Sequence, residues 1–109
     1  MNFILGEQKI DKQRRINIGR FFRLGSTQEK VIPVYDEDAD AIAIFRLDEV
    51  DFGTPANIDG KGRIIIKESI LKQVKVDTNL YRLAVKDNIR YLIPIPPEDN
   101  SLPNVVATD

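Results

Sequence analysis

The chain has 109 residues, of which 42% are hydrophobic and 30% charged, a balance typical of a small globular protein. It has no Cys and no His, which excludes disulfides, a thiol nucleophile and the usual general base and metal ligand. We therefore expect a non-enzymatic protein with no metal and no cofactor. No apolar run approaches the roughly 18 residues needed to cross a bilayer, and Met1 to Gly6 lacks the basic flank of a signal peptide. The sequence thus predicts a cytoplasmic protein without membrane contact.

The net charge of −1 conceals an uneven distribution of charge along the chain. Residues 1–35 and 58–95 each carry +4, whereas residues 36–57 carry −6 and residues 96–109 carry −3. Because electrostatic fields are screened over roughly 8–10 Å, two basic segments can form a basic face on a protein that is acidic overall. The alternative is that the acidic segments only keep the protein soluble.

An internal repeat is the most informative feature of the sequence. Residues 10–18 read IDKQRRINI and residues 58–66 read IDGKGRIII, so five of the nine positions are identical at an offset of 48. A helix-like stretch follows each copy, at residues 19–24 and at residues 67–74. Two strand-like runs then follow at an offset of 49, at 30–35 with 41–45 and at 80–85 with 90–95. Polar turns separate these runs at 36–40 and 86–88, and Gly25 is placed to end the first helix.

These elements predict a mostly β fold with short helices. We place the first half at residues 1–46, a linker at 47–56, the second half at 57–95 and a disordered Pro-rich tail at 96–109. Since a half of about 45 residues is too small to bury a good core alone, two tandem βαβ-type halves should interleave their hairpins into one pseudo-symmetric barrel. The run Ile64 to Ile66 should be buried on both faces of its strand. The expected core residues are Ile10, Ile16, Ile18, Phe22, Val31, Val34, Ile42, Ile44, Ile58, Ile64, Ile66, Ile70, Leu80, Leu83, Leu92 and Ile93.

The pattern Ile-Asp-Lys-x-x-Arg-Ile-x-Ile, then a short helix ending in Arg, then Leu-Gly and two hairpin strands, resembles the AbrB-type swapped-hairpin superfamily of DNA-binding proteins. The tandem arrangement is similar to the MraZ type of that superfamily, over residues 7–46 and 56–95. The resemblance implies swapped-hairpin halves and a homo-oligomeric, nucleoid-associated regulator of transcription that binds double-stranded DNA with a sequence preference. The family usually has Gly before the loop Arg. Gly62 keeps it, but Arg14 replaces it in the first loop, which predicts either a different loop shape or an added phosphate contact.

The two Asp-x-x-x-Arg loops are the predicted DNA-binding site. Arg15 and Arg63 should contact a phosphate or a guanine edge, and Asp11 and Asp59 should orient them. The alternative is that each Asp–Arg pair only closes its loop. Further cations could support the contact, although each one taken singly is better interpreted as a plain solvated surface charge: Lys9, Lys12, Arg14, Arg20, Arg23, Lys61, Lys67 and Lys72.

Other readings of the sequence remain open. Phe21 and Phe22 could form a stacking platform for single strands, although Phe22 is better interpreted as core. The acidic cluster at residues 36–40 is better interpreted as a solvated turn than as a cation site. The acidic tail could bind a protein partner, as in an antitoxin-like interaction module. The chain could also be an oligomerisation scaffold without DNA binding.

Overall fold

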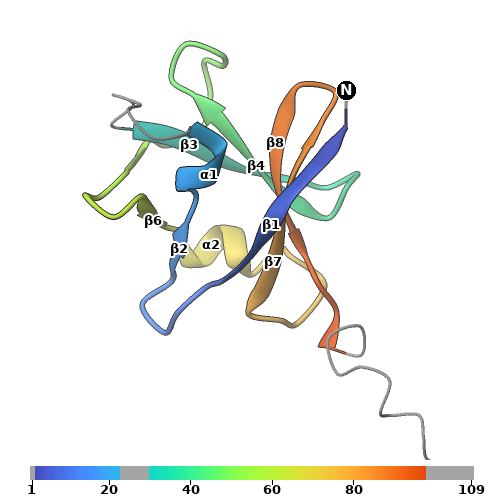
Figure 1. Cartoon of the computed structure of the whole chain (residues 1–109). Coiled ribbons are helices and arrows are strands. Elements are labelled where there is room, and N and C mark those ends of the chain that lie inside the picture. Colours follow the sequence, from blue (N-terminus) through green and yellow to red (C-terminus); the bar gives the residue numbers. More distant parts are fainter. Residues whose placement is uncertain (1, 23–29, 98–109) are drawn as a thin grey trace, which may run out of the picture.

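The computed structural model describes residues 2–22 and 30–97 of the chain, and the fold is mostly β with two short helices, as predicted (Figure 1). Six strands form one antiparallel sheet in the order β1-β7-β8-β4-β3-β5, and two more form a separate antiparallel ribbon, β2-β6. In chain order the elements are β1 (Phe3–Lys9), β2 (Arg15–Asn17), α1 (Gly19–Phe22), β3 (Lys30–Asp36), β4 (Ala41–Arg46), β5 (Ala56–Asn57), β6 (Arg63–Ile65), α2 (Glu68–Leu71), β7 (Leu80–Lys86) and β8 (Ile89–Pro94).

Strands from residues 3–46 and strands from residues 56–94 are interleaved within the large sheet. The hairpin β7–β8 lies between β1 and β4, so that Phe3 is opposite Val85 and Ile42 is opposite Leu92. Exchanging β1 with β5, β3 with β7 and β4 with β8 gives the same strand order read from the opposite edge of the sheet. The sheet is open, with β1 and β5 at its two ends, so the closed barrel expected from the sequence is not confirmed.

The pairing corrects the predicted offset between the second parts of the repeat. The pair Lys9–Leu80 corresponds to the pair Lys30–Asn57, so β3 and β7 match at an offset of 50 rather than 49. The difference arises in the hairpin turns, because β3 ends opposite Ala41 after four turn residues, whereas β7 ends opposite Ile89 after two. An odd offset would place each residue on the opposite face of its strand, so only the even offset keeps the core positions aligned.

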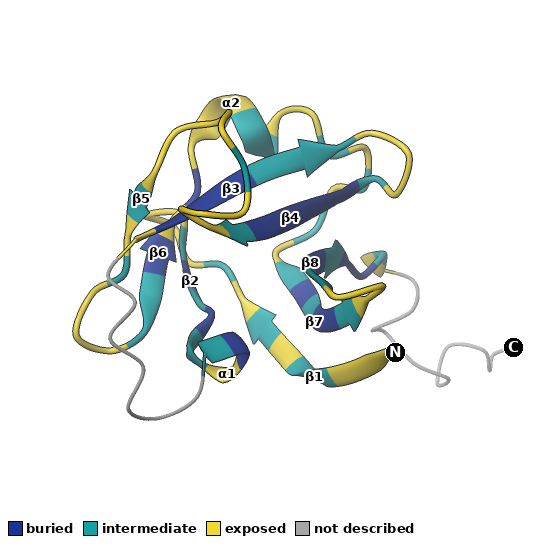
Figure 2. Cartoon of the chain, turned by 90° about the horizontal axis from the view of Figure 1, so that it is seen from above, coloured by how far each residue is buried: buried dark blue, intermediate teal, exposed yellow. Residues whose placement is uncertain are grey.

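The core lies between the sheet, the ribbon and the two short helices. Its buried members are Ile16, Ile18, Phe21, Val31, Ile42, Ile44, Ile64, Ile66, Tyr81, Leu83 and Leu92. Exposed residues gather in the loops and along β1 (Figure 2). Ile10, Phe22, Ile58 and Ile70 pack against this core but are only partly buried, and Val34, Leu80 and Ile93 are also only partly buried.

The prediction that Phe22 is the core ring is right only in part, and the prediction that Ile65 is buried is wrong. Phe21, not Phe22, is the buried ring of α1, and Phe22 instead lies 4.9 Å beneath the guanidinium of Arg90. Ile65 is 52% exposed, because side chains alternate along β6 and its neighbours Ile64 and Ile66 are the ones that point into the core. Phe21 and Phe22 meet edge to face and both contact the core, which favours the core interpretation over a stacking platform.

Several predicted features fall outside or at the margin of the described residues. Arg23 and Gly25, and the tail beyond residue 97, lie outside them. The segment 47–55 joins β4 to β5, while Ala56, the last residue of the predicted linker, begins β5.

The helices α1 and α2, each four residues long, are too short to cross a membrane, and no longer apolar helix occurs in the described ranges.

Candidate nucleic-acid interface

The ribbon β2–β6 brings the two predicted loops side by side. Arg15 is opposite Ile65, Ile16 is opposite Ile64, and Asn17 is opposite Arg63. Because side chains alternate along a strand, the 1% exposed Ile16 and Ile64 point into the core. The remaining four side chains, those of Arg15, Asn17, Arg63 and Ile65, therefore share the outward face of the ribbon.

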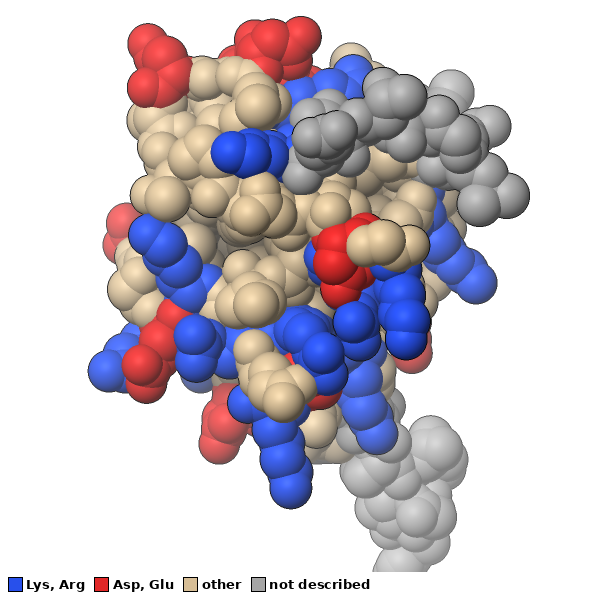
Figure 3. Space-filling view, turned by 90° about the vertical axis from the view of Figure 1, so that its left-hand side faces the viewer, with Lys and Arg blue, Asp and Glu red and all other residues tan. Residues whose placement is uncertain are grey.

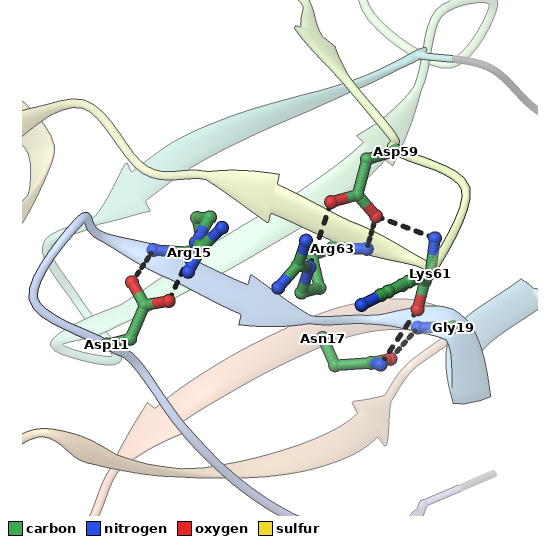
Figure 4. A network of polar contacts seen from close by, with 7 residues as sticks. All are labelled: Asp11, Arg15, Asn17, Gly19, Asp59, Lys61 and Arg63. Atoms are coloured by element: carbon green, nitrogen blue, oxygen red, sulfur yellow. Dashed lines mark hydrogen bonds and ion pairs between the residues drawn. The ribbon is translucent and has the colours of Figure 1, made fainter.

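Asp11 closes the first loop and fixes its arginine at the same time (Figure 4). Its Oδ1 accepts hydrogen bonds from the backbone N–H groups of Gln13 and Arg15, both at 2.9 Å. Its Oδ2 accepts a hydrogen bond from Nε of Arg15 at 2.7 Å. Asp11 therefore both closes the loop, through Oδ1, and holds the guanidinium of Arg15, through Oδ2.

The second loop repeats this arrangement. Oδ1 of Asp59 accepts from the backbone N–H groups of Lys61 at 2.8 Å and Arg63 at 2.9 Å. Oδ2 accepts from Nε of Arg63 at 2.9 Å. The hydrogen bonds from the arginine backbone, aided by the guanidinium, hold the pKa of both carboxyl groups below the ordinary value of 3.8. Both carboxylates therefore stay charged under ordinary conditions, and each arginine stays fixed.

Arg14 adopts the backbone conformation that the glycine of the second loop adopts. Its φ is 64°, compared with 83° for Gly62, and each donates its N–H to the carbonyl of the loop Asp, at 2.9 Å and 3.0 Å respectively. The expectation of a differently shaped first loop is therefore wrong. The side chain of Arg14 is exposed and its Nε donates to the carbonyl of Ile66 at 3.0 Å, which places this cation beside Lys67.

The supporting cations fall into two groups. Lys12, Lys61 and Lys67 are exposed in or beside the loops, and the face of β2, β6 and α1 shows Lys and Arg side chains gathered over its lower half with a few carboxylates among them (Figure 3). Three others lie on other elements. Lys9 is exposed at the end of β1, Lys72 pairs with Glu68 of α2 at 3.8 Å, and Arg20 donates from Nη1 to the carbonyl of Leu5 in β1 at 2.8 Å.

Two residues of the outward face were missed by sequence reasoning. Asn17 donates from Nδ2 to the carbonyl of Lys61 at 3.0 Å and accepts from the N–H of Gly19 at 2.8 Å, which ties the second loop to the start of α1. Ile65 occupies the matching position of the other half, 48 residues later, and is exposed. The repeat alignment could have marked this position, because a polar residue of the first copy is aligned there with an apolar residue of the second.

The acidic cluster at residues 36–40 is a hairpin turn, as predicted. Asp36 accepts from the hydroxyl of Tyr91 at 3.0 Å, and Asp40 accepts from the N–H of Lys75 at 3.0 Å. The hydrogen bond between Tyr35 and Asp40 raises the pKa of Tyr35 to about 12. Within residues 2–22 and 30–97, no group of three acidic side chains is arranged to hold a metal ion.

Comparison of the chain with protein-family models, with curated proteins and with solved structures found no match.

Proposed function

We propose that the protein is a sequence-preferring transcriptional regulator that binds double-stranded DNA through the outward face of the β2–β6 ribbon and its two loops. The observation that carries the proposal is the paired arrangement of Arg15 and Arg63 on that face. Each guanidinium is held through Nε by its own carboxylate. Among the described residues, these Nε bonds are the side-chain hydrogen bonds that the two arginines make, and the side chains are 34% and 29% exposed, which leaves Nη1 and Nη2 as donors for a ligand.

A two-stranded ribbon is one of the elements that fit the major groove of B-form DNA. The guanidinium fork can bind a phosphate, or the O6 and N7 edge of guanine, through two hydrogen bonds. A fixed guanidinium loses less conformational entropy on binding than a free side chain. Asp11 and Asp59 act as positioning residues, because a carboxylate would be repelled by phosphate.

The local charge of the ribbon fits a polyanion despite the net charge of −1. Two acidic residues at the β3–β4 turn are engaged within the protein, because Asp36 accepts from the hydroxyl of Tyr91, and Asp40 accepts from the hydroxyl of Tyr35 and the N–H of Lys75. Phosphate contacts by Lys12, Arg14, Lys61 and Lys67 would supply most of the affinity and make it strongly dependent on salt. Lys9 and Arg20 are weaker candidates, and for Arg20 the bond to Leu5 assigns a role in holding β1.

The fold is consistent with two interleaved swapped-hairpin halves related by a pseudo-twofold axis. The symmetric strand order and the matched hydrogen bonds of the two loops support this arrangement. It would present the two arginines to a duplex in related orientations. A homo-oligomer would present further ribbons and so raise the affinity by linking contacts.

The test is a fluorescence-anisotropy titration with a duplex from the region upstream of the gene, at two salt concentrations. The wild type should bind this duplex more tightly than an unrelated one, and the affinity should fall steeply with salt. Arg15→Ala and Arg63→Ala should each weaken binding by roughly 1–3 kcal/mol. Arg82→Ala is the matched control, because it also breaks an exposed ion pair, to Glu7 at 3.3 Å, but on the large sheet.

If the wild type binds no duplex at low salt, the DNA-binding proposal fails and a protein partner becomes the better hypothesis. If Arg15→Ala, Arg63→Ala and Arg82→Ala all bind as the wild type does, DNA is bound elsewhere and the ribbon is structural.

A further inference from the structure

The two ends of the β2–β6 ribbon differ in chemistry, although their backbones match. At one end Arg63 lies opposite Asn17, whose amide donates to the carbonyl of Lys61 in the second loop and accepts from the N–H of Gly19 at the start of α1. At the other end Arg15 lies opposite Ile65, whose side chain is 52% exposed. A branched aliphatic side chain is therefore presented to solvent directly beside a fixed guanidinium.

A second copy of the chain is a poor partner for this exposed side chain. Ile65 shares its end of the ribbon with Arg15, and with Arg14, which is bonded to the carbonyl of Ile66, next to Lys67. Two copies facing each other through this surface would bring like charges together, which opposes association. The surface instead complements a partner that is polyanionic and also offers a small apolar group.

We propose that Ile65 reads the 5-methyl group of a thymine in the bound duplex, an inference that rests on the proposed DNA-binding function. In the major groove, thymine is the base that presents a methyl group, and apolar side chains contact it there. Cβ atoms of cross-strand neighbours lie about 4.5–5.5 Å apart. Ile65 and Arg15 would therefore reach the same base-pair step or adjacent ones.

The inference makes the recognition by one ribbon directional. Asn17 holds the position equivalent to Ile65 and offers no apolar surface, so a thymine is preferred on one side only. The duplex sequence selected by a single ribbon should therefore not be palindromic at this position. The arginine contacts alone, which are matched at the two ends, would not produce this asymmetry.

The experiment begins by enriching preferred duplexes from a random pool with the wild-type protein. Each thymine of the enriched duplex is then replaced by deoxyuridine, which removes only the methyl group, and the Kd is measured by anisotropy. At one thymine the wild type should lose about fourfold in affinity, the value that corresponds to burial of one methylene-sized group. Ile65→Asn should bind the thymine and deoxyuridine duplexes equally. Ile4→Asn is the control, because Ile4 is 65% exposed on β1, and it should behave as the wild type does.

The outcomes separate this inference from the function on which it rests. If the wild type binds no duplex, both proposals fail. If it binds with a steep salt dependence but is indifferent to the loss of every methyl group, only the reading by Ile65 fails. The same conclusion follows if the enriched duplex has no thymine, or if Ile65→Asn weakens binding to every duplex equally.

Discussion

Gly62→Ala tests whether the second loop needs glycine at this position because its backbone there is left-handed. Gly62 has a φ of +83°, and an added Cβ would lie 3.3 Å from Cα of Gly19 and 3.4 Å from Oδ1 of Asn17. The left-handed conformation costs a residue with a side chain about 1–2 kcal/mol, and the close contacts add to this cost. The reduced entropy of the unfolded chain offsets about 0.4–1 kcal/mol. We therefore expect a net loss of about 1 kcal/mol in the free energy of unfolding.

Gly60→Ala is the matched control in the same loop. Apart from the glycine and its two chain neighbours, no atom lies within 4 Å of the position that its Cβ would take, and its φ is not in the left-handed region. Only the effect on the unfolded chain remains, so this change should leave the stability unchanged or raise it by up to about 1 kcal/mol. The measurement is urea-induced unfolding followed by circular dichroism, supported by thermal melts in which about 1 kcal/mol corresponds to roughly 4–8 °C in Tm. If the Gly62→Ala protein is as stable as the Gly60→Ala protein, the assigned backbone conformation is wrong.

Three further predictions concern packing and ionisation. Ile64→Ala should lower the free energy of unfolding by about 2–5 kcal/mol in urea titrations, whereas Ile65→Ala should change it by no more than about 0.5 kcal/mol; equal effects would contradict the assigned faces of β6. Because the folded-state pKa values of Asp11 and Asp59 lie below 3.8, their stabilisation is present above that pH and is lost as the pH falls through the lower values. The wild type should accordingly exceed the Asp11→Asn, Asp59→Asn double variant in stability at neutral pH, by a margin that shrinks as the pH falls below 3.8. The folded-state pKa of Tyr35, raised to about 12, means that stability should fall between about pH 10 and pH 12, and Tyr35→Phe should flatten this loss in alkaline unfolding titrations.

The sequence predicted the features that depend on local chemistry. The repeated Asp and Arg, four residues apart, were enough to predict the loops, because a short carboxylate can accept the N–H groups two and four residues later. The turns at 36–40 and 86–88 followed from their polar residues. Asp87 and Asn88 both have positive φ, which is what a two-residue hairpin turn requires.

The features that the sequence did not predict depend on pairing between distant segments. The run Ile64–Ile66 consists of three β-branched residues and so has no alternation from which to assign an inner face. Its orientation is set by pairing with β2, which leaves Ile65 outside. The choice between Phe21 and Phe22 has the same cause, because the direction of a four-residue helix is fixed by the core that it covers and not by its own periodicity.

The interleaved strand order has a consequence for how the chain is made. Phe3 pairs with Val85, so β1 remains without its partner until 82 further residues have been synthesised. At roughly 5–20 residues per second, that interval is on the order of 4–16 s, during which a strand with exposed Phe3 and Ile4 waits on the nascent chain. Pairing between segments so far apart in sequence slows folding. It also allows β1 of one nascent chain to pair with β7 of a second chain. Neither half can complete its sheet alone, so a prematurely ended chain would lack the hairpin that β1 requires, and the full-length protein should unfold in a single cooperative transition.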